Sequence, residues 1–292
     1  MRPVLGEAAA LASAIFWGVG SVLLKRPSQR LGAFYISAVR MSVIGLLAVA
    51  CVAAAGQFGA ILHVSLKTFL EILFSAVVVA LGDTALYRAF GMGDLSRIFT
   101  INTGLYVLFS VLASALFLHE AITPRVVCGG VLVVLGIALI SERQRAVSGQ
   151  PSKGVPLMVL ALLVFTSATW AASLVALNHA MKNVDTLPGA AIRMPLMALT
   201  ILPVALLRGD VKRHKLGGPD KLALVASGVC GAGSSLLWLA AIKYADASIA
   251  AILNSTAPVF VLMMTTAFLH ERPTRRSLTG TVICMAGIVL TV

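Results

Sequence analysis

Long apolar stretches alternate with short polar breaks along the whole chain. Each stretch reaches or approaches the roughly 20 residues that a helix needs to cross a bilayer. The breaks carry turn-forming and charged residues, as "KRPSQRLG" (25–32) and "RGDVKRHKLGGPDK" (208–221) do. The pattern predicts an all-α integral membrane protein with ten transmembrane helices, over residues 7–24, 33–55, 66–90, 97–118, 125–141, 155–178, 187–207, 221–243, 248–269 and 276–292.

The second half of the chain repeats features of the first in the same order. "ALFLHEAIT" (115–123) returns 151 residues later as "TAFLHERPT" (266–274). Further matches, at offsets of 151 or 153, are Trp17 with Trp170, Arg40 with Arg193, Gly82 with Gly233, Phe109 with Phe260, Gly129 with Gly280 and Gly136 with Gly287. The polar stretch 142–154 therefore links a first five-helix repeat, residues 1–141, to a second, residues 155–292. Because five is odd, we expect inverted repeats, a common plan of secondary transporters.

Composition supports a membrane protein and argues against a nucleic-acid partner. The chain is 59% hydrophobic and 12% charged, with a mean hydropathy of +0.97, whereas soluble domains carry about 25% charged residues. The net charge of +12 comes from short clusters of Lys and Arg between apolar spans. Such clusters are typical of loops on the cytoplasmic face of a membrane, rather than of one basic patch.

These charges also predict an orientation. Of the 23 Lys and Arg residues, 16 fall on one side of the ten-span arrangement and 5 on the side of the two chain ends, while Arg40 and Arg193 lie inside spans. The positive-inside rule then places both termini outside the cytoplasm.

The repeated Phe-Leu-His-Glu motif has two interpretations. A metal site would need a third ligand, and neither copy has one nearby. We therefore expect no metal or cofactor. Instead, we expect Glu120 and Glu271 to receive backbone N–H groups at the start of the next helix, with Thr123 and Thr274 as N-cap residues.

Glycines mark the fifth and tenth spans as packing elements. Gly129 and Gly136, like Gly280 and Gly287, are seven residues apart and share a helix face. Small residues at this spacing let membrane helices approach closely. The two spans are candidates to pack against each other rather than to line a cavity.

Polar and aromatic residues recur at helical spacing in several spans. Such side chains must face protein or water rather than lipid. Interhelical hydrogen bonding is one interpretation, and a wet cavity with aromatic walls between the repeats is the other. We favour the cavity and expect substrate-binding residues at Trp17, Asp83, Asn102, Tyr106, Trp170, Trp238, Asn254 and Ser255.

Asp83 is the most deeply placed acid, and its role stays open between a proton-coupling site, a partner for a substrate ammonium and a structural ion pair. Arg40 and Asp83 lie seven residues from the same side of the membrane, roughly 10 Å deep, so they can form a structural or gating pair. The position that matches Asp83 is Ser234. Arg193 then lacks an acid on that span, unless Asp185 or Asp246 reaches it, and is free to meet an anionic group. Alternatively, both arginines snorkel to the surface.

No pattern of an enzyme is present. An intramembrane serine protease needs an activated Ser with a base, and "GAGSS" (231–235) is not a nucleophile elbow. The sequence has no Gly-rich phosphate loop for ATP.

Four segments carry a resemblance to a known family. They are "FWGVGSVLLK" (16–25), the spans that hold Arg40 and Arg193, "NSTAPVFVLMMTTAFLHE" (254–271) and "TGTVICMAGIVL" (279–290). The sequence resembles the drug/metabolite transporter superfamily, EamA type, over essentially its whole length. The resemblance implies ten spans, a cavity lined by helices 1, 3, 4, 6, 8 and 9, and termini in the cytoplasm. For the termini we follow the charges instead, which place both ends outside the cytoplasm. One departure is Pro258, whose counterpart in the first half is Val107.

We therefore expect a secondary active transporter in the cytoplasmic membrane of a prokaryote. By the resemblance, it exports small organic metabolites such as amino acids or related amphipathic compounds. Proton antiport, exchange and facilitated diffusion are all compatible with the sequence, as are a monomer and a homodimer. A channel or a membrane scaffold without transport is the alternative.

Overall fold

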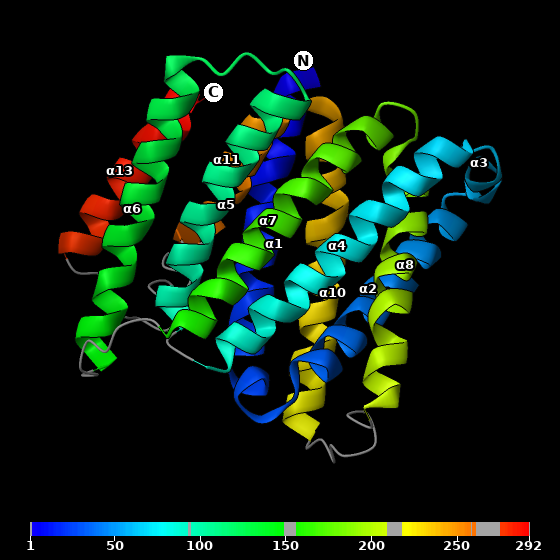
Figure 1. Ribbon diagram of the computed structural model, residues 1–292, viewed down its shortest axis with the longest axis horizontal. Coiled ribbons are helices and arrows are strands. Elements are labelled where there is room, and N and C mark those ends of the chain that lie inside the picture. The colour runs from blue at the N-terminus through cyan, green and yellow to red at the C-terminus, as the bar shows by residue number, and fades with distance from the viewer. Residues whose placement is uncertain are drawn as a thin grey trace.

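The computed structural model describes residues 2–92, 95–148, 156–208, 218–257, 259–260 and 275–291. Within these residues every regular element is a helix (Figure 1). The helices are α1 (Arg2–Arg30), α2 (Ala33–Ala54), α3 (Phe58–Leu62), α4 (Leu66–Phe90), α5 (Leu95–Phe117), α6 (Pro124–Ser148), α7 (Leu157–Met181), α8 (Thr186–Leu207), α10 (Gly218–Tyr244), α11 (Ala247–Asn254) and α13 (Arg275–Thr291). Six of them, α1, α2, α4, α7, α8 and α10, are long and apolar enough to cross a membrane. The chain is a multi-pass helical membrane protein.

The other predicted spans are shorter or only partly described. α5, α6 and α13 contain the apolar stretches Ile101–Phe117, Pro124–Leu139 and Thr279–Leu290. The predicted ninth span, 248–269, continues beyond α11 into residues outside the described part of the chain. Pro258, His270, Glu271 and Thr274 lie outside it as well. The count of ten spans therefore stays a prediction.

Two predicted breaks are partly helical. α1 continues through Pro27 to Arg30, and α6 continues to Ser148, seven residues past the predicted end of the first repeat. The physical reason is that "SERQRAVS" (141–148) is polar but rich in Glu, Arg, Gln and Ala, which favour helix. Hydropathy locates the apolar part of such a helix and misses its polar end. The short helix α3 was also not predicted.

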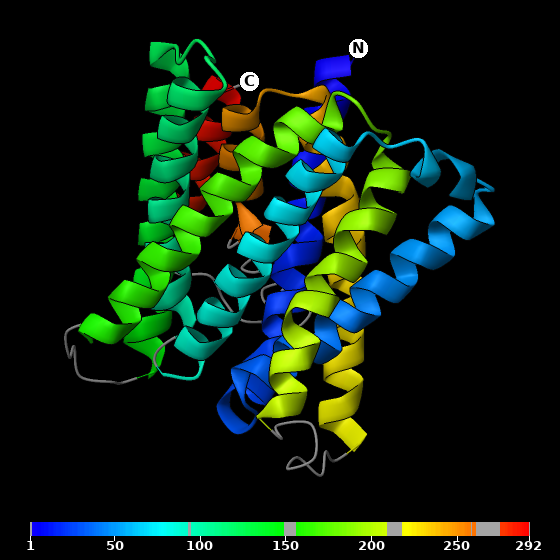
Figure 2. The same cartoon turned by 45° about the vertical axis from the view of Figure 1, so that its right-hand side comes forward.

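The helices pack in pairs across the middle of the sequence. α1 packs against α10, α4 against α7, α2 against α8 and α6 against α13 (Figures 1 and 2). Each pair joins one helix from before residue 149 to one from after it. The two halves are therefore interleaved, and contacts between them build the core.

Glycines bring α6 and α13 into backbone contact. A Cβ atom at Gly136 would lie 2.6 Å from the carbonyl oxygen of Gly280, and one at Gly287 would lie 2.7 Å from that of Gly129. Real Cβ atoms do not approach this closely, so only glycine fits. The prediction that the fifth and tenth spans pack through these glycines is confirmed, because α6 and α13 pack against each other.

Glu120 caps a helix, but not the one predicted. Its Oε1 accepts a hydrogen bond from the backbone N–H of Ala247 at 2.7 Å, and its Oε2 accepts one from Ser248 at 3.1 Å. These groups begin α11, in the other half of the chain, whereas the expected helix was α6. α6 is capped by Thr123, as predicted, because its Oγ1 accepts from the N–H of Val126 at 3.3 Å. Capping chemistry can be recognised in a sequence, but the helix that reaches the cap is set by tertiary packing.

We expect Glu120→Gln to destabilise the fold by about 1–2 kcal/mol, because it removes a charge-assisted cap from the positive end of a helix. The measurement is thermal unfolding of the purified protein in mild detergent, followed by circular dichroism.

Asp246→Asn is the matched control. Asp246 holds the N-cap position of α11 but makes no side-chain capping bond. Burial, and then the carboxylate of Glu120, raise the pKa of Asp246. The ionised form therefore costs stability above the unfolded-state pKa, about 4, so at neutral pH the control should leave the melting temperature unchanged or higher. Equal losses in the two variants would contradict the capping role of Glu120.

Candidate functional site

One small cavity lies among α1, α4, α5, α7 and the end of α11. Six of the eight predicted substrate-binding residues line it: Trp17, Asn102, Tyr106, Trp170, Asn254 and Ser255. Leu86, Thr103 and Ala257 complete the described lining. The structure thus brings together residues from both halves that are up to 238 positions apart in the sequence. Their role in binding a substrate stays a prediction.

The cavity is contracted in this conformation. Its volume is about 20 Å³, which leaves room for one or two waters. A metabolite could enter only if the walls moved apart.

Aromatic contacts hold the walls of the cavity. The ring centroids of Trp17 and Trp170 are 5.7 Å apart, and those of Tyr106 and Trp170 are 5.5 Å apart, both edge to face. Edge-to-face pairs of this kind are favourable beyond the area that they bury. Trp170 of α7 is therefore the central aromatic residue, in contact with α1 and α5 together.

The two asparagines of the lining differ in their hydrogen bonds. The hydroxyl of Ser167 donates to the side-chain oxygen of Asn102 at 3.3 Å and to its backbone carbonyl at 3.2 Å. The side-chain oxygen of Asn254 is buried and has no hydrogen-bond partner among the described residues. Because a buried polar atom normally has a partner, Asn254 leaves the cavity with an acceptor that a ligand or water can use.

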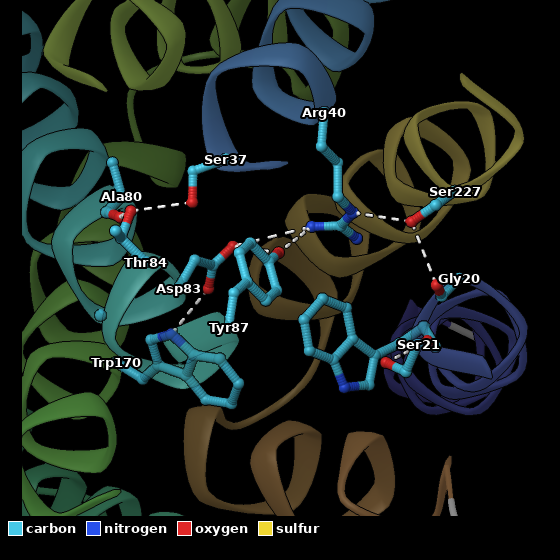
Figure 3. Close-up of polar contacts among 12 residues, drawn as sticks. Gly20, Ser21, Ser37, Arg40, Ala80, Asp83, Thr84, Tyr87, Trp170 and Ser227 are labelled. Atoms are coloured by element: carbon cyan, nitrogen blue, oxygen red, sulfur yellow. Dashed lines mark hydrogen bonds and ion pairs between the residues drawn. The ribbon is translucent and has the colours of Figure 1, made fainter. Parts of the chain in front are cut away.

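Asp83 and Trp238 are not among the residues that line this cavity. Asp83 lies behind Trp170 and accepts a hydrogen bond from its indole Nε1 at 3.0 Å (Figure 3). Trp238 packs against the apolar clusters of the core instead. Both residues face inward, as their spacing predicts, but helical spacing does not reveal which of several inward directions a side chain takes.

The carboxylate of Asp83 forms a buried ion pair with Arg40. Their nearest oxygen and nitrogen atoms are 3.8 Å apart, and the two side chains are 7% and 2% exposed. Tyr87 lies between them, accepting from Arg40 and donating to Asp83 at 3.3 Å (Figure 3). The structure therefore pairs Arg40 with Asp83, as their equal depth predicts. Whether this pair gates transport stays a prediction.

Arg40 also connects the pair to two further helices. Its Nε donates to the hydroxyl of Ser227 in α10 at 3.2 Å, and that hydroxyl donates to the carbonyl of Gly20 in α1 at 3.0 Å. The guanidinium lies 5.0 Å from the ring centroid of Trp17. Each member of the ion pair thus contacts one tryptophan of the cavity wall, Arg40 through Trp17 and Asp83 through Trp170.

Arg193 is held by two serines. Its Nε donates to Ser75 at 3.0 Å and its Nη2 to Ser173 at 3.3 Å. Within the described residues no carboxylate forms a close ion pair with it. Asp185 pairs with Lys243, Asp246 lies at the start of α11, and Asp83, which interacts with Arg193 electrostatically, is paired with Arg40. The arginine is 3% exposed. The alternative in which both arginines snorkel to the surface is wrong.

The contacts indicate an offset for α4 and α10 that differs by one residue from the predicted 151. Ser75 binds the Nε of Arg193, and Ser227 binds the Nε of Arg40, which places these serines in matching positions 152 residues apart. Likewise the hydroxyls of Thr166 and Ser13 donate to the backbone carbonyls of Gly82 and Ser234. Ser234 therefore corresponds to Gly82, and the match of Asp83 is Ser235.

Sequence reasoning missed the serines and Tyr87. Tyr87 follows Asp83 by four residues on one helix face, a spacing that could have identified it. The contacts of Arg40 with Ser227 and of Arg193 with Ser75 could not be predicted, because each joins residues of different halves and these serines match at neither 151 nor 153.

Comparisons with known proteins agree with this architecture. The EamA-like transporter family matches the chain twice, over residues 4–142 and 157–292. The uncharacterized transporter YvbV of Bacillus subtilis (strain 168) is 28% identical over 143 residues, 49% of this chain and 47% of that protein. The match thus spans about half the length of that relative.

A shorter relative and a solved structure complete the comparison. The uncharacterized protein MJ1333.1 of Methanocaldococcus jannaschii is 28% identical over 131 residues, which are 45% of this chain but 92% of that protein. That protein is therefore about half as long as this chain. A solved crystal structure superposes with a TM-score of 0.79, covering 99% of this chain and 96% of its own, at 15% identity. At that identity the likeness concerns the fold alone.

The Arg40–Asp83 pair can be tested by a double-mutant cycle. We expect Asp83→Asn and Arg40→Gln each to lower the free energy of unfolding by about 3–5 kcal/mol, because each leaves an uncompensated buried group. The double variant should recover at least about 1 kcal/mol of the summed loss. Chemical unfolding in detergent measures all four proteins.

Arg30 and Asp220 provide the matched control. They are 3.7 Å apart, but the side chain of Arg30 is 60% exposed, so their coupling should stay below about 0.5 kcal/mol. Additive losses for Arg40 and Asp83 would show that the two residues act independently.

Proposed function

The chain belongs to the EamA-like transporter family, and from this premise we propose that it is a secondary carrier that exports small organic metabolites through the cavity between its halves. The observation that carries the proposal is the cavity itself. An otherwise apolar bundle brings polar and aromatic side chains of both halves to one enclosed site. Amino acids and related amphipathic compounds are the proposed substrates, because their polar and apolar parts match such a lining.

We propose further that the two halves are inverted repeats, residues 1–141 and 155–292, joined by 142–154. Three observations support this. The family model matches twice. α1 and α7, the first long helices of the two halves, run in opposite directions in Figure 1. Arg40 of the first half binds Ser227 of the second, and Arg193 of the second half binds Ser75 of the first.

The contacts suggest how the carrier could alternate its access. The cavity is too narrow for a metabolite in this conformation, so a substrate must separate Trp17 from Trp170 to enter. Because those tryptophans contact Arg40 and Asp83, such a separation would disturb the ion pair that joins α2 to α4. The pair would then act as a gate, and Arg193 would provide the corresponding contact on the other side. Asp83 is engaged by Arg40, Tyr87 and Trp170, which favours this role over that of a substrate partner.

Counterflow in proteoliposomes tests the function. A thermal-stability screen of the purified protein against amino acids and related compounds should first identify a stabilising compound, because binding to the folded state raises its stability. The labelled compound should then exchange against internal unlabelled compound with saturating kinetics. We expect Asn254→Ala to lower the exchange rate at least about ten-fold by removing an acceptor of the cavity.

Asn183→Ala is the matched control, because it makes the same substitution at an asparagine that lies exposed in the turn between α7 and α8. It should exchange at the unchanged rate. Flux that does not saturate would identify a channel, and the absence of flux would identify a scaffold.

We also propose that both termini lie outside the cytoplasm, in a cytoplasmic membrane. In Figure 1 the N and C labels lie at the same end of the bundle, and that end carries the smaller share of the positive loop charges by the predicted arrangement of spans. A protein that fluoresces only in the cytoplasm, fused after Val292, should stay dark. Bright cells would place the termini inside instead.

A further inference from the structure

The described walls of the cavity carry no charge, so the groups behind them set its electrostatic sign. Every described lining residue is aromatic, apolar, a hydroxyl or an amide. Among the described residues, the ionisable groups buried next to these walls that carry a charge at neutral pH are Arg40, Asp83 and Arg193. One carboxylate thus faces two guanidinium groups, because Asp83 pairs with Arg40 and also interacts electrostatically with Arg193. Arg193 leaves one positive charge in excess.

Arg193 lies close enough to influence the cavity. Its partner Ser173 is one turn beyond Trp170 on α7. Arg193 interacts electrostatically first with Asp83, which is bound to Trp170, and then with Tyr106, which lines the cavity. The two serines accept hydrogen bonds from its Nε and Nη2, but they do not compensate its charge. In a medium of low dielectric constant such a charge acts over many ångströms and favours a nearby anion.

The aromatic residues do not offset this preference. An aromatic wall can bind an organic cation through its ring faces. Here the guanidinium of Arg40 already lies over the ring of Trp17, and Trp170 receives the edge-to-face contacts of Trp17 and Tyr106. The free acceptor of Asn254 takes an N–H from a neutral or a charged group alike, so it does not set the sign either.

We propose that the cavity selects substrates that carry a carboxylate, as organic anions or zwitterions, and rejects organic cations. Arg193 supplies the selectivity as a fixed buried charge. This inference rests on the proposed function, because it takes the cavity as the substrate site.

Three probes of one shape and different charge test the proposal. They are 3-phenylpropanoate, 3-phenylpropanamide and 3-phenylpropylamine, which are negative, neutral and positive at pH 7. Binding to the full-length protein in detergent is measured by the fluorescence of its three tryptophans, two of which line the cavity. We expect the dissociation constant of the propanoate to be at least about ten-fold lower than that of the propylamine, with the propanamide between them.

Variants assign the selectivity to Arg193. Arg193→Gln should weaken propanoate binding about ten-fold and leave the propanamide unchanged, while Arg193→Lys, which keeps the charge, should preserve the order of the probes. Arg208→Gln is the control on the same helix, because Arg208 lies at the end of α8 against the ring of Phe34. It should change none of the three constants.

The outcomes separate this inference from the proposed function. Equal constants for the three probes, or tightest binding of the propylamine, would overturn the charge selectivity and leave the cavity as the site. If none of the probes alters the fluorescence, both proposals are overturned. The series on the unmodified protein decides between these outcomes even if Arg193→Gln does not fold.

Discussion

The buried ion pair of Arg40 and Asp83 is the contact on which the rest of the centre depends. Removing either charge from water costs several kcal/mol, and only close partners offset that cost. The protein supplies them from five helices: Tyr87 beside Asp83 on α4, Ser227 on α10, Trp17 on α1 and Trp170 on α7, around Arg40 on α2. The contacts that stabilise these two buried charges therefore constrain how the five helices pack. This arrangement also positions the cavity walls, because Trp17 and Trp170 contact the ion pair and line the cavity.

The structure separates charge from lining. In the part of the chain that the structure describes, the cavity walls are neutral groups, and the ionised groups lie one layer behind them. A charge in direct contact with a ligand would bind it tightly and release it slowly, whereas a charge behind an uncharged wall biases entry without a strong bond. Under the proposed function such moderate binding is suitable, because a transporter must also release its substrate.

Much of this architecture can be predicted from the sequence, and the failures have physical reasons. Apolar length and the internal repeat predict the helices, and equal depth predicts the Arg40–Asp83 pair. Asp83 was expected in the cavity wall because helical spacing gives only a face, and its rotation toward Arg40 depends on helix packing. The helix capped by Glu120 could not be predicted, since α11 is 127 residues away and nothing local points to it. The match of Asp83 was wrong by one residue because the glycine matches suggested one offset of 151 throughout, whereas the serine contacts indicate 152 for α4 and α10.

Arg40 and Arg193 each bind a serine of the other half, so the two arginines meet their serines at different stages of biosynthesis. Ser75 precedes Arg193 by 118 residues, so when the ribosome delivers α8 to the membrane, that hydroxyl is already in place. Ser227 follows Arg40 by 187 residues, so α2 must wait in the bilayer through the synthesis of most of the chain. In the interval Asp83 and Tyr87 are the partners that reach the membrane first, since they belong to α4. Asp83, a carboxylate whose position in the other half holds a serine, is thus synthesised soon after Arg40 and long before Ser227. It can pair with the charge of Arg40 until translation is complete.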